Sequence, residues 1–252
     1  MPAALITGAS AGIGLELARV FAREGYSLVL VARNQKRLEE IAAELQPASV
    51  QVIAKDLSLP SAPEEIQRST PRVDVLVNNA GFGVYGKFAE TSLTEELNMM
   101  QLNMSALVAL TKLYLAGMVA ARSGRILNVA STAAFQPGPL MAIYYATKAF
   151  VLSFSEAIGN ELEGTGVTVT ALCPGPTATE FQERSKLQNS ALVKGKKIMD
   201  ARTVAEAGYR GMLAGKTIVI PGLKNKLLAQ SIRVSPRSMV TRIVRGMQEE
   251  VH

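Results

Sequence analysis

Short apolar runs alternate along this chain with stretches of helical spacing. The runs are Ala3–Thr7, Ser27–Ala32, Val50–Ala54, Val73–Val77, Arg125–Ala130, Val167–Leu172 and Thr217–Ile220. They are continuous rather than alternating, which indicates strands buried on both faces of a sheet. The helical stretches are Ile13–Glu24, Gln35–Leu45, Thr94–Ala121, Ile143–Glu163 and Val204–Ala214. We therefore expect an α/β fold with a doubly wound, mostly parallel sheet of about seven strands and helices on both faces.

No shift in composition marks a second domain, so we expect residues 1–252 to form one domain. The chain is 48% hydrophobic and 19% charged, which excludes a disordered chain. Residues 180–202 read as a polar insertion that closes over the site as a lid or stays a loop. Residues 224–252 read as a basic helical tail, in which Ser235 and Pro236 open a helix. Its apolar stripe comprises Met239, Val240, Ile243, Val244 and Met247.

Residues 224–248 of the tail account for the whole formal net charge of +6. Residues 224–248 hold six Lys and Arg residues and no acid, and the other 21 basic residues match the 21 acidic ones. No aromatic residues are interleaved with these basic residues, so we expect no binding of nucleic acid. Two interpretations stay open: a packed helix with a solvated basic face, or a weak contact with an anionic membrane surface or a phosphate-bearing carrier.

Cysteine and histidine are nearly absent. The lone Cys173 cannot form an internal disulfide, and the chain has one His, so we expect a reducing compartment and no metal site. The N-terminus lacks a basic region before its apolar residues and does not resemble a secretory signal. The longest uncharged run, Ile126–Thr147, contains polar residues and prolines and makes a poor membrane span. A soluble, cytoplasmic protein is the expectation.

A glycine-rich turn joins the first apolar run to the first helical stretch. It reads Thr7-Gly8-Ala9-Ser10-Ala11-Gly12-Ile13-Gly14, with the spacing G-x-x-x-G-x-G. In a Rossmann sheet this is the place where the pyrophosphate of a dinucleotide sits on a helix N-terminus. Glycine lets the backbone approach the phosphates closely. We expect the cofactor to contact Gly8, Ser10, Gly12, Ile13 and Gly14.

The end of the second strand indicates which dinucleotide is bound. An acid there would bind the ribose 2′-hydroxyl of NAD, but the chain has Ala32-Arg33-Asn34. Arg33 offers a charge-assisted contact to the 2′-phosphate of NADP, so we expect NADPH to be preferred over NADH. Asn34 is an alternative candidate for a helix N-cap. Asp56 and Leu57, which follow the third strand, are candidates for flanking the adenine.

A tyrosine and a lysine lie four residues apart in the sequence Tyr144-Tyr145-Ala146-Thr147-Lys148. At this spacing Tyr144 and Lys148 share one face of a helix, whereas Tyr145 would pair with Ala149. A neighbouring ammonium is expected to lower the pKa of the Tyr144 phenol toward the range useful for acid–base catalysis. Ser131 follows the fifth run, at the sheet edge where such folds bind ligands.

Together these motifs resemble the short-chain dehydrogenase/reductase family, in its single-domain branch. Asn78-Asn79-Ala80-Gly81 matches the family's N-N-A-G, and Ser131, Tyr144 and Lys148 match its serine and Y-x-x-x-K pattern. The resemblance implies a homodimer or homotetramer, a catalytic Asn103, and cofactor contacts from Asn79, Ala80, Gly81, Pro174, Gly175, Thr177, Thr179, Tyr144 and Lys148. It also implies that Tyr144 exchanges the proton, Ser131 orients the carbonyl and Asn103 holds a relay water. The sequence departs from many NADP users in having Ala11 where they carry a basic residue.

The resemblance implies hydride transfer between NADP(H) and a ketone, an aldehyde or a secondary alcohol. The loops expected to contact the substrate, Phe82–Tyr85, Phe135–Met141 and Glu180–Phe181, are largely apolar, which favours a carbonyl reductase of a largely apolar substrate. One alternative is a non-catalytic dinucleotide-sensing or scaffold protein on the same fold. Another is an epimerase or dehydratase with retained NAD, whose relatives usually have a different glycine spacing and a larger substrate domain.

Overall fold

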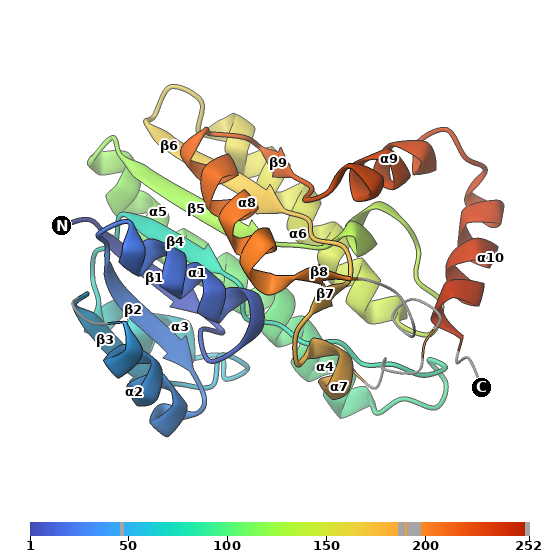
Figure 1. Ribbon diagram of the computed structural model, residues 1–252, viewed down its shortest axis with the longest axis horizontal. Coiled ribbons are helices and arrows are strands. Elements are labelled where there is room, and N and C mark those ends of the chain that lie inside the picture. The colour runs from blue at the N-terminus through green and yellow to red at the C-terminus, as the bar shows by residue number, and fades with distance from the viewer. Residues whose placement is uncertain (46–47, 186–189, 191–197, 250–252) are drawn as a thin grey trace.

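A computed structural model describes residues 1–45, 48–185, 190 and 198–249 of the chain. At its centre lies a seven-stranded sheet in the order β3-β2-β1-β4-β5-β6-β9, with every neighbouring pair parallel (Figure 1). The strands are β1 (Ala3–Thr7), β2 (Ser27–Ala32), β3 (Val50–Ala54), β4 (Val75–Asn78), β5 (Gly124–Val129), β6 (Val167–Leu172) and β9 (Ile218–Val219). The predicted sheet is confirmed, and four strands match the predicted runs residue for residue.

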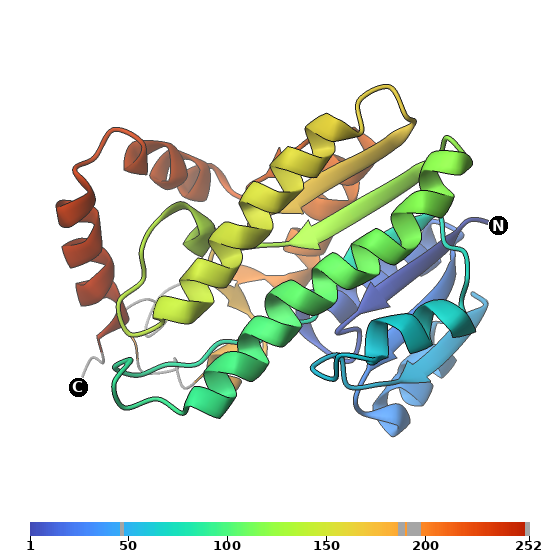
Figure 2. The same ribbon diagram turned by 180° about the vertical axis from the view of Figure 1, so that it is seen from behind.

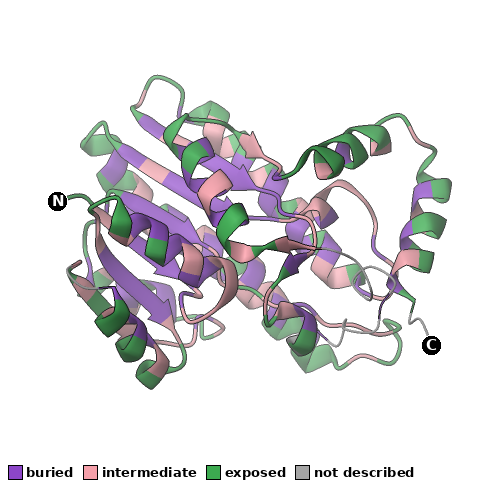
Figure 3. Cartoon of the chain, viewed as in Figure 1, coloured by how far each residue is buried: buried purple, intermediate pink, exposed green. Residues whose placement is uncertain are grey.

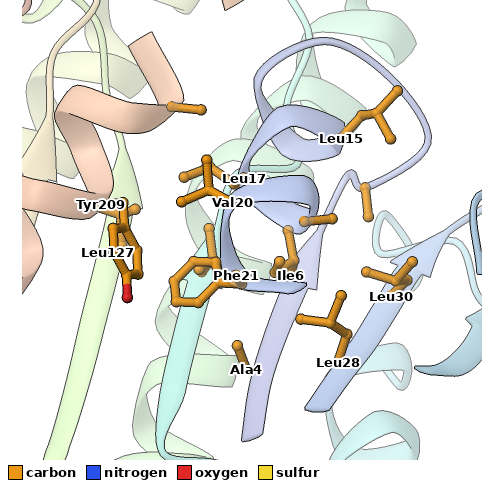
Figure 4. Packing of buried hydrophobic residues seen from close by; sticks show 14 of the residues in the cluster. Ala4, Ile6, Leu15, Leu17, Val20, Phe21, Leu28, Leu30, Leu127 and Tyr209 are labelled. Carbon is orange, nitrogen blue, oxygen red and sulfur yellow. The ribbon is translucent and has the colours of Figure 1, made fainter. Parts of the chain in front are cut away.

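The central strands are largely apolar because successive side chains enter different cores. In β2, Leu28 and Leu30 face one core, whereas Val29 and Val31 face the other. The first core also contains Phe21, whose ring meets that of Tyr209 edge-on at 5.1 Å between centroids (Figure 4). Figure 3 shows the central strands largely buried, whereas β3, at the edge of the sheet, has no fully buried residue. Continuous rather than alternating hydrophobicity follows directly from this two-sided burial.

Helices cover both faces of the sheet, as predicted. On one face lie α1 (Gly12–Arg23), α2 (Gln35–Glu44) and α8 (Ala201–Leu213). On the other lie α3 (Ala62–Ser69), α5 (Leu107–Ala120) and α6 (Ala142–Glu161), with α5 and α6 side by side in Figure 2. The prediction contained no helix at α3, which is short. Its N-terminal end carries Pro63, Glu64 and Glu65, which favour a helix start but give no long apolar period.

The long helix predicted at Thr94–Ala121 is interrupted. It consists of α4 (Leu93–Met100), a π-helical segment at Gln101–Ala106, and α5. By length and composition alone, the stretch Leu93–Ala120 could cross a membrane, a test that core helices also pass. Here Leu110, Tyr114 and Met118 pack into the core on the α3 side of the sheet.

Helix ends follow local side-chain chemistry. Helix α8 begins at Ala201 rather than at the predicted Val204, because Asp200 accepts a hydrogen bond from the Thr203 backbone N–H at 2.7 Å. Gly25 and Gly164, predicted after helix C-termini, have φ of +81° and +78° and follow α1 and α6 closely. The left-handed backbone at these two positions explains the glycines.

The insertion at residues 180–202 is described in part. The insertion begins with helix α7 (Phe181–Arg184). Two short parallel strands, β7 (Thr177–Ala178) and β8 (Met199–Asp200), pair with each other near the two ends of the insertion. Residues 186–189 and 191–197, which carry most of the expected lid, lie outside the described residues.

The tail forms two helices, α9 (Leu223–Ile232) and α10 (Arg237–Gln248), which extend as an arm beyond the end of the sheet (Figures 1 and 2). The prediction that Ser235 caps the second helix is wrong, because Pro236 occupies the N-cap position. The Ser235 hydroxyl instead donates a 2.8 Å hydrogen bond to the Ser231 carbonyl oxygen. Helix α9 was not predicted as a separate element.

Candidate active site

A cavity of about 870 Å³ opens at the carboxyl ends of the central strands. In folds of this type, ligands bind at this edge of the sheet. Of the predicted site residues, the following line the cavity: Gly8, Ser10, Gly12, Ile13, Arg33, Asp56, Leu57, Asn79, Ala80, Gly81, Ser131, Tyr144, Lys148, Pro174, Gly175, Thr177 and Thr179. Gly14 and Asn103 do not line it, and both lie one layer behind it. The sequence therefore located one common site from segments far apart in the chain.

The glycine turn is packed too tightly for any side chain at its key positions. A Cβ atom at Gly14 would lie 2.2 Å from the Gly8 carbonyl oxygen, and one at Gly8 would lie 2.8 Å from Asn79 Nδ2. Gly8 and Gly12 also have positive φ, at +65° and +55°. Ala11, the N-cap of α1, makes no side-chain capping bond. The first backbone N–H groups of α1 are thereby left to a ligand rather than to a serine or aspartate cap.

Thr7 ties the glycine turn to the end of β4. Its hydroxyl donates to the Val77 carbonyl oxygen at 3.1 Å and accepts from the backbone N–H groups of Asn79 and Ala80 at 2.9 and 3.0 Å. The Asn79 side chain donates to the carbonyl oxygens of Thr7 and Gly8. The N-N-A-G segment therefore fixes the shape of the turn through buried hydrogen bonds.

At the other end of the cavity, Arg33 and Asp56 lie at the ends of β2 and β3. Arg33 is exposed, and its positive charge adds to hydrogen bonds from Ser58 in lowering the pKa of Asp56 against the opposing effect of burial. Asn34 caps α2, since its side chain accepts a 3.0 Å hydrogen bond from the Arg37 N–H. Because Asn34 provides this cap, Arg33 has no capping role in α2. Lys55 also lines the cavity and forms an ion pair with Glu65.

Ser131, Tyr144 and Lys148 come together where β5 meets α6. Ser131 follows β5, and its hydroxyl accepts from the Ala133 N–H at 3.0 Å and donates to the Pro174 carbonyl oxygen at 3.4 Å. Tyr144 and Lys148 lie one turn apart on α6, with the ammonium 5.8 Å from the centroid of the phenol ring. Lys148 is buried, and Nζ donates to the Val129 carbonyl oxygen at 2.8 Å.

The electrostatics of this trio differ from the prediction. Burial raises the pKa of Tyr144 above its usual value of 10, and a hydrogen bond with Ser131 opposes only part of that rise. Burial also lowers the pKa of Lys148 to about 8. The predicted lowering of the Tyr144 pKa is therefore wrong for this arrangement, because desolvation raises that pKa. The same desolvation makes Lys148 a group that titrates near neutral pH.

Asn103 supports the trio from behind. It lies in the π-helical segment, where it accepts from the Phe82 N–H at 3.1 Å and donates to the Phe82 carbonyl oxygen and to Thr147 Oγ1. A Cβ atom at Gly81 would lie 2.9 Å from Asn103 Oδ1 and 3.7 Å from Lys148 Nζ. Interruptions of this kind in α-helices often occur at functional sites. Here Asn103, in the interrupted segment, links the loop after β4 to α6 through its hydrogen bonds with Phe82 and Thr147.

Sequence reasoning missed one wall of the cavity. Helices α9 and α10 supply it, through Asn225, Leu228, Ala229, Ser231, Ile232, Ser235, Met239, Val240, Ile243, Val244 and Met247. The predicted apolar stripe is real, but it faces the cavity as well as packing on the domain. Val240 and Val244 form a small core with Ala133, Met141 and Tyr145, beside Tyr144. The loops predicted to contact the substrate also line the cavity, at Phe82, Gln136, Met141, Glu180 and Phe181.

Comparison with known proteins identifies the family. A family model for short chain dehydrogenases matches residues 2–190. The very-long-chain 3-oxoacyl-CoA reductase of Phaeosphaeria nodorum is 35% identical over an alignment of 219 positions, which covers 82% of this chain and 64% of that protein.

Solved structures agree with this match over more of the chain. The short-chain dehydrogenase from Sphingobium yanoikuyae in complex with NADPH is 32% identical with a TM-score of 0.83, covering 94% of this chain and 97% of that one. The bulky-bulky ketone specific alcohol dehydrogenase from Comamonas testosteroni is 30% identical with a TM-score of 0.79, covering 94% and 95%. The chain therefore belongs to the short-chain dehydrogenase family and has the Rossmann-type fold of that family of oxidoreductases.

Proposed function

We propose that the protein is an NADP(H)-dependent oxidoreductase that reduces the carbonyl group of a largely apolar ketone or aldehyde. The observation that carries the proposal is the meeting of Ser131, Tyr144 and Lys148 in one cavity. On one side of them lies the polar glycine turn, and on the other lie the apolar side chains of α9 and α10. A dinucleotide would bind against the polar wall, and an apolar substrate would bind against the apolar wall.

The residues around the glycine turn fit a dinucleotide. Gly8, Gly12 and Gly14 leave a cradle that a Cβ atom would fill, at a helix N-terminus without a side-chain cap. Arg33 would bind the 2′-phosphate of NADP, and Asp56 and Leu57 would flank the adenine. NADP complexes also occur among the family members described above, as in the Sphingobium enzyme with NADPH. The bound nicotinamide would supply the hydride.

The remaining chemistry belongs to side chains of this chain. Ser131 would donate a hydrogen bond to the substrate oxygen and so orient the carbonyl group. The Tyr144 hydroxyl, whose raised pKa keeps it protonated, would then deliver the proton to that oxygen. Lys148, with its pKa near 8, would replace the proton at Tyr144, and Asn103 would hold the supporting loop and a relay water.

The charge pattern of the cavity favours a substrate without a carboxylate. Among the described residues that line it, the charged side chains are Arg33, Lys55, Asp56, Lys148 and Glu180. The first three lie at the proposed adenosine end. Elsewhere along the described lining the charged side chains are Lys148 and Glu180, with no arginine among them to bind an acid group. The Comamonas enzyme, by its name, acts on bulky ketones, which agrees with this expectation.

A panel of ketones and aldehydes tests the proposal, with oxidation of NADPH and of NADH followed by absorbance. We expect turnover with apolar ketones, faster with NADPH. Tyr144→Phe should lower kcat by about 10²–10⁴-fold. Tyr145→Phe is the matched control, because Tyr145 is the adjacent buried phenol and should keep most of the activity. Undiminished turnover in Tyr144→Phe would refute the proposed proton transfer.

A further inference from the structure

The outer face of the tail carries apolar side chains that no part of the described chain covers. Leu223 and Leu227 on α9 are 73% and 62% exposed, and Val234, between α9 and α10, is 87% exposed. None of the three lines the cavity. Leu223 and Leu227 are four residues apart and form one stripe along the helix. Gathered exposed apolar residues of this kind mark a contact surface.

Cations flank these apolar residues on each side. Helical spacing places Lys224 on one side of the leucine stripe and Lys226 on the other. In the connection to α10, Arg233 and Arg237 bracket Val234. Within the part of the chain that the structure describes, none of these four cations forms an ion pair. An apolar centre with unpaired cations at its edges is typical of helices that lie in a membrane interface.

The mouth of the cavity lies at the same arm of the molecule. Leu228, Met239 and Ile243 line the cavity, and each is about half exposed. Their helices, α9 and α10, carry the flanking cations, and Figure 3 shows both helices largely exposed. The arm that carries Leu223, Leu227 and Val234 on its outer face therefore also supplies a wall of the cavity.

We propose that this surface docks on a lipid bilayer with anionic headgroups. The leucines and Val234 would enter the interfacial layer, and Lys224, Lys226, Arg233 and Arg237 would contact the lipid phosphates. Charge favours a bilayer over a second copy of this chain, because the copy would bring the same positive surface. The docking does not rest on the proposed function.

Co-sedimentation of the full chain with vesicles tests the docking without cofactor or substrate, so that its outcome is independent of the enzymatic proposal. We expect binding to vesicles of phosphatidylcholine with phosphatidylglycerol, weakened by salt, and little binding to phosphatidylcholine alone. Lys224→Gln with Lys226→Gln and Arg233→Gln should weaken binding about fivefold per cation removed. Leu223→Ser with Leu227→Ser should weaken it by about tenfold or more.

Matched variants elsewhere on the surface serve as controls. Arg72→Gln with Lys112→Gln and Lys216→Gln removes three other exposed cations, and Leu59→Ser removes another exposed leucine. Both controls should bind as the unaltered chain does, and circular dichroism should show every variant folded. Soluble glycerol phosphate should not displace the protein, and displacement would indicate a simple anion site instead. Equal binding to neutral vesicles, or equal losses in tail and control variants, would overturn the proposal.

Discussion

Two walls of unlike construction enclose the same cavity. The glycine turn and the end of β4 are built from close backbone contacts and partly buried hydrogen bonds, such as those of Thr7 with Asn79 and Ala80. Helices α9 and α10 present half-exposed apolar side chains, and they lie beyond residue 190, where the match to the family model ends. We therefore expect the first wall to bind the cofactor and the second wall to set which substrate is bound.

Substitution of one glycine in each wall tests the difference between the two walls most strongly. Gly14→Ala places a Cβ atom 2.2 Å from the Gly8 carbonyl oxygen, which is backbone and cannot move aside. We expect a loss of about 3 kcal/mol or more in the free energy of unfolding, with loss of NADPH binding. Thermal unfolding and NADPH fluorescence would measure both effects.

Gly246→Ala in α10 is the matched control. An added Cβ atom there meets nothing within 4 Å, so the change should raise stability by about 0.5–1 kcal/mol through helix propensity. If the two substitutions had similar effects, the two walls would not differ in the way described.

A buried lysine gives the next largest effect. Since burial lowers the pKa of Lys148 to about 8 from 10.5, folding at pH 7 must bury a charged ammonium or remove its proton. Lys148→Met should therefore stabilise the protein at pH 7 by about 2 kcal/mol, after loss of the hydrogen bond to Val129 is counted. Activity should be lost at the same time, a trade expected where function needs a strained site.

The pH dependence identifies the cause of this stabilisation. Between pH 8 and 10.5 the lysine is neutral in the folded chain and protonated in the unfolded chain, so the stability of the unaltered protein rises with pH. The advantage of Lys148→Met should accordingly be complete below pH 8, decline as the pH rises above 8, and be gone before about pH 10.5. Urea unfolding of both proteins at several pH values would show it. Arg242→Met, on the exposed side of α10, should show no such window.

The two walls also differ in how well the sequence predicted them. The sequence predicted the glycine turn from Gly8 to Gly14 and the trio of Ser131, Tyr144 and Lys148. Both motifs can be recognised from residue type and spacing alone. The apolar stripe at Met239–Met247 was also predicted, but its position on the cavity was not. An apolar stripe indicates that one face of a helix is covered and does not identify what covers it. Burial likewise reversed the predicted pKa of Tyr144, because the degree of desolvation is set by tertiary packing.

The preference for NADPH over NADH tests the role of Arg33 in the first wall. Arg33 is exposed and is the cation proposed to bind the 2′-phosphate of NADP. Arg33→Ala should weaken NADPH binding by about tenfold, or about 1.4 kcal/mol, and leave NADH binding almost unchanged. Titration of each cofactor by fluorescence would measure the ratio. Equal loss for both would refute a role for Arg33 in selecting the phosphate.

The smallest expected effect tests whether the second wall selects the substrate. Ile243 lines the cavity and is half exposed, so Ile243→Ala removes apolar contact area without opening the core. We expect KM for a bulky apolar ketone to rise about three- to fivefold, or up to about 1 kcal/mol, because the lost contact stabilises bound substrate and transition state equally. NADPH affinity and kcat should stay constant, because Ile243 belongs to α10 and not to the glycine turn or to the trio of Ser131, Tyr144 and Lys148. Leu227→Ala, an exposed residue of α9 that does not line the cavity, should leave KM unchanged. A change in kcat rather than KM would mean that the tail positions the reacting groups, and the division between the two walls would then fail.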